Sequence, residues 1–124
     1  MRWIVDAMNV IGCRPDGWWK DRRAALTRLV DQLDRWADRG GHRVTVVLER
    51  PMSPPIKAAV IEVAHAPRGG TNSADDEIVQ LVRDDEQPQE ITVVTSDAGL
   101  ARRIRDIGAA VYPAGGFRTM IESG

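Results

Sequence analysis

Apolar residues occur along the chain in short, nearly continuous runs separated by charged, glycine and proline residues. Runs of three to six such residues are too short for helices and are typical of strands that are buried on both faces. The sequence therefore predicts a sheet of four to five strands, over residues 3–5, 44–48, 59–64, 91–95 and 110–112.

Between several of these runs the apolar residues are spaced three and four positions apart, which places them on one face of a helix. Residues 21–39 carry such a stripe and stop at a pair of glycines, a common helix end. A second helix begins near Ser73, a typical N-cap, with three acidic residues in its first turn. A third spans residues 97–107 and ends before a glycine.

The alternation of strands and helices predicts the connectivity of the sheet. It favours an α/β fold, a Rossmann-like three-layer sandwich around a central, mostly parallel sheet, in a single domain over residues 1–124. The link between the strands 44–48 and 59–64 is short for a parallel crossover. The sequence of this link is compatible with one helical turn near Ile56. Residues 12–19 are expected to form a loop, and the tail from Pro113 one packing turn.

Composition and charge are those of a globular domain and indicate no particular binding partner. The chain has 124 residues, of which 43% are hydrophobic and 28% charged, as in ordinary globular domains. A net charge of −1 argues against tight, sequence-independent nucleic-acid binding but permits a local basic rim. The first apolar run stops at Asp6, so we expect no membrane span and a cytoplasmic protein. Cys13 is the single cysteine and is expected in a loop or the core.

Acidic residues from three separate segments are predicted to meet at one edge of the sheet. Asp6 ends the first strand, with Asn9 shortly after it, and Asp97 follows the fourth strand. Asp75 and Asp76 begin a helix whose N-terminus should face the same edge. Because sites in open parallel sheets lie outside the carboxyl ends of the strands, we expect these side chains to form one site.

Such a cluster needs a counterion. Two carboxylates about 5 Å apart repel by roughly 3 kcal/mol at an effective dielectric constant near 20. Carboxylate, amide and water oxygens suit Mg²⁺ or Mn²⁺, whereas His42 and His65 are isolated and form no zinc-type cluster. Phosphodiester hydrolysis is the reaction that best suits this arrangement.

Each acid also has a simpler explanation. The acids of the second helix would complement its dipole, and Asp97 would be a first-turn residue behind a Ser96 cap. Asp6 is harder to explain in this way, because an acid next to a buried strand costs free energy unless it is paired. The combination of three segments is more specific than any one of them.

Three segments, taken in order, carry a resemblance to a known family. They are Val5-Asp6-Ala7-Met8-Asn9-Val10-Ile11, Ser73-Ala74-Asp75-Asp76-Glu77-Ile78-Val79, and Val93-Val94-Thr95-Ser96-Asp97, the last followed by Leu100 and Gly108-Ala109. Together they resemble the NYN domain and, more closely, the YacP-like ribonucleases of the PIN-like superfamily. The resemblance implies a PIN-like nuclease fold, in which Asp6, Asp75 and Asp97 bind Mg²⁺ or Mn²⁺ and Asp76 assists.

The resemblance also assigns roles around the metal acids. Asn9 would orient Asp6 or touch the phosphate, and Thr95 and Ser96 would contact the phosphate or support the acids. In-line attack by water would leave a 5′-phosphate. The chain departs from the family at Ala7 and Met8, where Gly and Tyr are more usual, which affects substrate choice more than metal binding.

Candidate substrate contacts lie mostly after the first strand. Cations interleaved with aromatic rings suit a single strand of RNA, since the charges follow phosphates and the rings stack on bases. The candidates there are Arg14, Trp18, Trp19, Lys20, Arg22 and Arg23, with Arg68 and either Arg102 or Arg103 elsewhere. The alternative is that one Trp packs in the core and the cations are solvated. Gly69-Gly70 lacks the residues of a phosphate loop and is expected to be a turn.

The sequence therefore predicts a metal-dependent ribonuclease, in the first instance an endoribonuclease. It would act on single-stranded or messenger RNA alone, at the ribosome, or under a regulatory protein, and a homodimer is compatible with this. The alternative is a non-catalytic PIN-like module that binds RNA or protein, although such a module has no need of three converging acids. A response-regulator receiver fits less well, because Ala64-His65-Ala66 replaces the required aspartate after the third strand.

Overall fold

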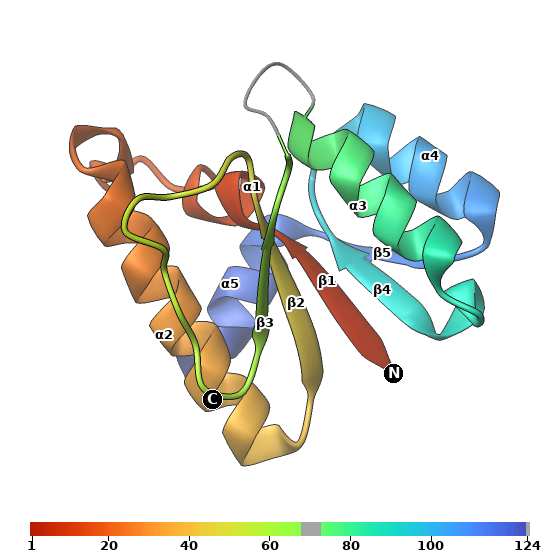
Figure 1. The fold of residues 1–124 in the computed structure, drawn as a ribbon, viewed down its shortest axis with the longest axis horizontal. Coiled ribbons are helices and arrows are strands. Elements are labelled where there is room, and N and C mark those ends of the chain that lie inside the picture. Colours follow the sequence, from red (N-terminus) through yellow and green to blue (C-terminus); the bar gives the residue numbers. More distant parts are fainter. Residues whose placement is uncertain (68–72, 124) are drawn as a thin grey trace.

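The fold is a five-stranded sheet with helices on both faces (Figure 1). It is taken from a computed structural model that describes residues 1–67 and 73–123. The elements, in chain order, are β1 (Arg2–Asp6), α1 (Ala7–Ile11), the 3₁₀ turn η1 (Trp18–Lys20), α2 (Arg22–Gly40), β2 (Arg43–Leu48), β3 (Glu62–His65), α3 (Ser73–Asp84), the 3₁₀ turn η2 (Pro88–Glu90), β4 (Ile91–Val94), α4 (Ala98–Ile107), β5 (Ala110–Tyr112) and α5 (Ala114–Ser123).

All neighbouring strands in the described residues pair in parallel, in the order β3-β2-β1-β4-β5. β1 lies at the centre, where Asp6 pairs with Val47 of β2 and Val5 with Val94 of β4. This confirms the three-layer α/β fold with a parallel sheet. It also brings the ends of β1, β2 and β4 to one edge, as the site prediction requires.

Alternate residues of the strands face two separate cores. Val5 and Val94 pack with α1, α2 and α5 on one face, whereas Ile4 and Val93 pack with α3 and α4 on the other. Figure 1 shows these two layers of helices on either side of the sheet. All four valine and isoleucine side chains are fully buried, so the central strands are apolar on both faces, as their composition indicated.

Three local predictions were wrong or incomplete. The third strand begins at Glu62 rather than at residue 59, and residues 49–61 contain no helical turn near Ile56. Helix α1 was not predicted, and the loop expected over residues 12–19 runs into the 3₁₀ turn η1 at Trp18. The tail forms the ten-residue helix α5 rather than one turn. None of the helices in the described ranges is long and apolar enough to cross a membrane.

Asp34 explains why the third strand starts late. Its carboxylate accepts hydrogen bonds from the backbone N–H groups of Ala59, Val60 and Ile61, at 2.8–3.0 Å. These donors hold the pKa of Asp34 below its ordinary value. The three residues are therefore bound to α2 by their N–H groups and cannot pair with β2.

We predict that Asp34→Ala destabilises the fold by about 1–2 kcal/mol, because three partly exposed hydrogen bonds to one charged group are lost. Urea unfolding monitored by circular dichroism measures the change. Asp31→Ala is the matched control, since Asp31 is exposed on the same helix and makes no hydrogen bond in the described residues. An equal loss in both variants would contradict this role of Asp34.

Candidate active site

Carboxylates from four segments line one cavity at the carboxyl edge of the sheet. Its volume is about 300 Å³, and we call it the acidic cavity. The acids come from the ends of β1 and β2, the first turn of α3 and the start of α4. The residues that line it are Asp6, Met8, Asn9, Trp18, Glu49, Ser73, Ala74, Asp75 and Asp97.

Asp6 and Asp97 are linked through Thr95, a buried residue just after β4. The hydroxyl of Thr95 donates to Oδ2 of Asp6 at 3.1 Å and accepts from the backbone N–H of Asp97 at the same distance. Oδ1 of Asp97 in turn accepts from the N–H of Leu100 at 2.8 Å, so Asp97 is the N-cap of α4. Thr95 thus fixes the positions of both acids. The expected Ser96 cap is not formed.

Burial makes Asp6 a weak acid. Its side chain is 5% exposed, and the loss of solvation raises its pKa to about 6. The hydrogen bond from Thr95 and the backbone N–H of Asn9 oppose this rise, while the charges of Asp75 and Asp97 add to it. Asp75 and Asp97 therefore act on Asp6 as near neighbours, and the metal-free site is electrostatically unfavourable at neutral pH.

Asp75 and its neighbour Asp76 have different surroundings. Asp75 lines the acidic cavity, and burial first and Asp97 second raise its pKa. Asp76 is exposed, and its Oδ1 pairs with Arg103 at 3.0 Å. It lines a separate pocket on the outer side of α3. The structure thus brings Asp6, Asp75 and Asp97 together and turns Asp76 toward Arg103.

Glu49 is a site residue that the sequence analysis missed. It follows β2 directly, lines the acidic cavity, and pairs with Arg22 at 3.5 Å. The signal that identified Asp6 and Asp97, an acid at the end of a buried strand, applies equally to Glu49.

Asn9 and Ser96 connect the segments that carry the acids. Oδ1 of Asn9 accepts from the backbone N–H of Ser96 at 2.7 Å, and Oγ of Ser96 accepts from the N–H of Ala114 at 2.9 Å. Helix α1, the start of α4 and helix α5 are thereby held together below the cavity. Asn9 also lines the cavity, and its NH₂ group makes no hydrogen bond in the described residues.

Trp18 and Arg22 are the substrate candidates nearest the acids. Trp18 lines the acidic cavity, with the guanidinium of Arg22 5.5 Å from its ring centre. Arg22 also pairs with Glu49, so this one cation contacts both an aromatic ring and a carboxylate that line the cavity. Trp19 packs edge-on to Trp18 and is 52% exposed.

The other substrate candidates lie elsewhere or are free on the surface. Arg14 pairs with Glu122 of α5 at 2.7 Å, and Arg23 donates to the carbonyl of Pro54 at 2.7 Å. Lys20 and Arg102 are exposed and form no ion pair within the described ranges. Arg68 lies outside the described residues, as does the turn predicted at Gly69-Gly70.

The donor set of the acidic cavity has the chemistry that hard divalent cations prefer. Its carboxylates and the carbonyl oxygen of Asn9 are oxygen donors. Burial is the main reason that the pKa of Asp6 and Asp75 is raised, and a cation would relieve the repulsion that adds to it. In residues 1–67 and 73–123, no three carboxylate, imidazole or thiolate groups already stand at the mutual spacing of ligands around one ion. Binding would therefore draw the side chains inward.

The histidines and the cysteine lie away from the acids. His42 stacks on Trp36 with ring centres 3.8 Å apart, and Nδ1 of His65 is 2.9 Å from the carbonyl of Ala66. Cys13 is exposed in the loop after α1. The two histidines therefore have partners of their own, as expected for residues outside a metal site.

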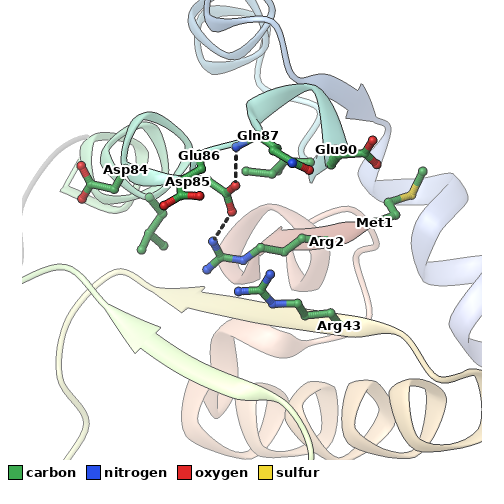
Figure 2. Close-up of a pocket in the computed structure, with 10 residues that line it drawn as sticks. Met1, Arg2, Arg43, Asp84, Asp85, Glu86, Gln87 and Glu90 are labelled. Carbon is green, nitrogen blue, oxygen red and sulfur yellow. Dashed lines mark hydrogen bonds and ion pairs between the residues drawn. The ribbon is translucent and has the colours of Figure 1, made fainter.

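A larger cavity of about 610 Å³ lies at the opposite edge of the sheet, where the strands begin (Figure 2). Arg2 pairs there with Asp85 at 3.2 Å and with Glu62 at 3.5 Å, and its guanidinium also donates to Thr45. Figure 2 shows Arg43 beside Arg2 at the base of this cavity. These contacts tie the start of β1 to the end of α3 and to β3, which is a structural role far from the acids.

Comparisons with known proteins agree with this geometry. The family described as the YacP-like NYN domain matches residues 3–123. The structure of Rae1 (YacP) from Bacillus subtilis is 25% identical, with a TM-score of 0.81 over 99% of this chain and 74% of that one. A tryptophan-to-leucine mutant of the same protein gives 24% identity and a TM-score of 0.79, over 99% and 75%. No curated protein matches the chain.

The parallel sheet with carboxylates converging at its carboxyl edge defines an α/β domain with an acidic site where such folds bind ligands. The chain belongs to the YacP-like NYN domain family. The resemblance carried by the three sequence segments is thereby confirmed, and so is the fold that it implied.

Proposed function

We propose that the protein is a metal-dependent ribonuclease, most simply an endoribonuclease, that hydrolyses RNA phosphodiester bonds at the acidic cavity. The observation that carries the proposal is the convergence of Asp6, Asp75 and Asp97 on one cavity, where the charge of Asp97 adds to the burial that raises the pKa of both Asp6 and Asp75. Family membership supports the same reading, because the relatives share this fold over nearly the whole chain.

Asp6, Asp75 and Asp97 would hold one or two Mg²⁺ or Mn²⁺ ions, with Glu49 at the rim as a further oxygen donor. When bound, such an ion polarises the phosphate, lowers the pKa of a water and stabilises the leaving oxygen. The exposed Asp76 would act from outside the cavity through Arg103, rather than as a ligand.

The residues around the acids would orient the substrate. The hydroxyl of Thr95 keeps Asp6 in place, and the NH₂ group of Asn9 is available to donate to a phosphate oxygen. Trp18 would stack on a base beside the scissile phosphate, and Arg22 would neutralise the negative charge of the neighbouring RNA phosphates. These contacts favour a single strand, since a paired base cannot reach the ring.

The proposal is tested by incubating the protein with a fluorescent single-stranded RNA in the presence of Mn²⁺, Mg²⁺ or EDTA. Cleavage is expected only with metal, with internal cuts that leave a 5′-phosphate. Cleavage that persists in EDTA would contradict a metal mechanism. RNA binding by gel shift without any cleavage in Mn²⁺ would instead favour the non-catalytic module.

Trp18→Leu is expected to raise KM for single-stranded RNA about tenfold with a smaller change in kcat, because base–aromatic stacking is worth roughly 1–3 kcal/mol. Trp19→Leu is the matched control, since Trp19 is mostly exposed and does not line the acidic cavity. Steady-state kinetics of both variants with Mn²⁺ measure the difference. Equal KM values in the two variants would show that Trp18 does not contact the RNA.

A further inference from the structure

A second, smaller cavity shares Trp18 with the acidic cavity. Its volume is about 200 Å³, and we call it the side cavity. Trp18 lines both cavities, so the two are neighbours that share one aromatic wall. Pockets for drug-sized ligands hold roughly 300–1,000 Å³, so the side cavity has room for about one planar ring system.

The side cavity is lined mainly by polar groups, with buried apolar side chains behind them and Trp18 on one side. Ile11 of α1 and Ala25 and Leu29 of α2 are buried residues of the core that reach its surface. Because these three side chains expose so little surface, the ring of Trp18 is the flat face on which a heteroaromatic base would stack.

Arg118, Asp16 and Glu122, which line the side cavity, are paired with one another. The guanidinium of Arg118 donates to the carbonyls of Val10 and Ile11 and to the carboxylate of Asp16, and it pairs with Glu122 at 3.6 Å. Arg118 is 17% exposed and holds the pKa of Asp16 below its ordinary value. This network fixes the loop that leads to Trp18. Arg14 also pairs with Glu122 at 2.7 Å, so two cations balance the two carboxylates.

Arg28 and Gln32 are the polar groups of the side cavity that remain unused. They lie one turn apart on α2 and both line the cavity. Within the described residues, neither side chain makes a hydrogen bond or an ion pair. Their donors, five on Arg28 and two on Gln32, are therefore available to a ligand that enters beside Trp18.

We propose that the side cavity binds one nucleobase of the RNA, next to the phosphate held in the acidic cavity, and that it prefers guanine. The inference rests on the proposed function, because it takes RNA as the substrate. Guanine presents two adjacent acceptors, O6 and N7, which match the guanidinium fork of Arg28. Adenine offers an amino donor at the first of these positions, which an arginine cannot accept.

The test uses free nucleotides as probes, so that it does not depend on cleavage. In EDTA, 5′-GMP, AMP, CMP and UMP are titrated separately into isotope-labelled protein and followed by NMR. The side-chain amide of Gln32 and the indole N–H of Trp18 are expected to shift with GMP. The affinity for GMP should be roughly five- to hundredfold higher than for AMP, the range for one bidentate contact to a base.

Arg28→Met should abolish this preference. Arg35→Met is the matched control, because it removes the same charge from α2 about 10 Å further along, at a residue that does not line the side cavity. Equal shifts with all four nucleotides would overturn the assignment to guanine. Absence of shifts at millimolar nucleotide would overturn the nucleobase site and leave a protein side chain as the better occupant.

The two proposals fail separately. If GMP binds as expected but no RNA is cut in Mn²⁺, the side cavity stands and the ribonuclease proposal falls. If RNA is cut with no preference at guanines and Arg28→Met behaves like the wild type, the ribonuclease stands and the side cavity is not a base site. Sequencing the cleavage products of a mixed-sequence RNA provides this second measurement.

Discussion

Asp97→Asn is expected to reduce Mn²⁺-dependent cleavage of single-stranded RNA by more than roughly a hundredfold, while the melting temperature changes little. Loss of groups that only orient metal ligands already costs ten- to a hundredfold. Asp97 is also the N-cap of α4, through its bond from Leu100. Because asparagine caps helices as well as aspartate, the substitution removes the charge and keeps the helix start. Initial cleavage rates and thermal melts by circular dichroism measure the two effects.

Two further variants separate catalysis from folding. Asp106→Asn removes one charge from an exposed position on the same helix and should cleave like the wild type. Asp97→Ala should lose activity as well as about 1 kcal/mol of stability, because the cap is lost. Full activity in Asp97→Asn would show that Asp97 is not a metal ligand. The proposed metal site would then have no carboxylate from the segment after β4.

The fold was predictable where burial alone decides the element. Residues 91–94 and 110–112 are apolar runs between a turn and a helix, and they form strands close to where the pattern puts them. The run at residues 59–61 has the same appearance, yet its N–H groups bind Asp34, and Val60 is 50% exposed. No periodicity within one segment reveals a carboxylate supplied from a helix 25 residues away. Helix α1 was missed because five residues are too few to show a helical period.

The site was predictable to the extent that topology determines it. The ends of β1 and β4 and the start of α3 meet because parallel strands share an edge, and Asp6, Asp75 and Asp97 line one cavity as a result. Asp76 lies next to Asp75 in sequence, but one helical step of about 100° turns it to Arg103. Glu49 was overlooked although the same edge argument applies to it.

Long cationic side chains were the least predictable part of the site. Arg14 and Arg23 lie in the basic segment after β1, yet one pairs with Glu122 and the other with the carbonyl of Pro54. Their partners are about a hundred and about thirty residues away, so only the tertiary structure reveals them. The aromatic wall at Trp18 was easier to predict, because rings in a loop between cations are rarely all buried.

The buried charge of Asp6 leads to the second large effect, which concerns stability rather than catalysis. Its pKa is about 6 in the folded protein and near 3.8 when exposed, so the folded state holds the proton more tightly. The stability from this group is therefore fully present below pH 3.8 and is lost as the pH rises through 6. At 1.36 kcal/mol per unit of pKa, the loss is about 3 kcal/mol. The pKa of Asp75 is also raised, so this group likewise lowers the free energy of unfolding as the pH rises.

In EDTA, the free energy of unfolding of the wild type should therefore fall between pH 4.5 and pH 7.5, as measured by urea titration. The acids with lowered pKa, Asp16, Asp34 and Asp85, lose their contribution only below pH 3.8, outside this window. Asp6→Asn should flatten the dependence and exceed the wild type at pH 7.5. A wild-type stability that rises with pH across the window would contradict the assignment.

Millimolar Mn²⁺ should reverse this behaviour in the wild type at pH 7.5, because a cation that binds only the folded state shifts the unfolding equilibrium and relieves the repulsion around Asp6. At pH 4.5 the gain should largely vanish, since Asp6, whose pKa is about 6, is then protonated. Asp6→Asn should show little gain at either pH, and Asp106→Asn should respond like the wild type. A gain of equal size in Asp6→Asn would place the bound Mn²⁺ at some other part of the molecule. A site that is costly when empty and favourable when filled is expected if the carboxyl edge evolved to hold a metal.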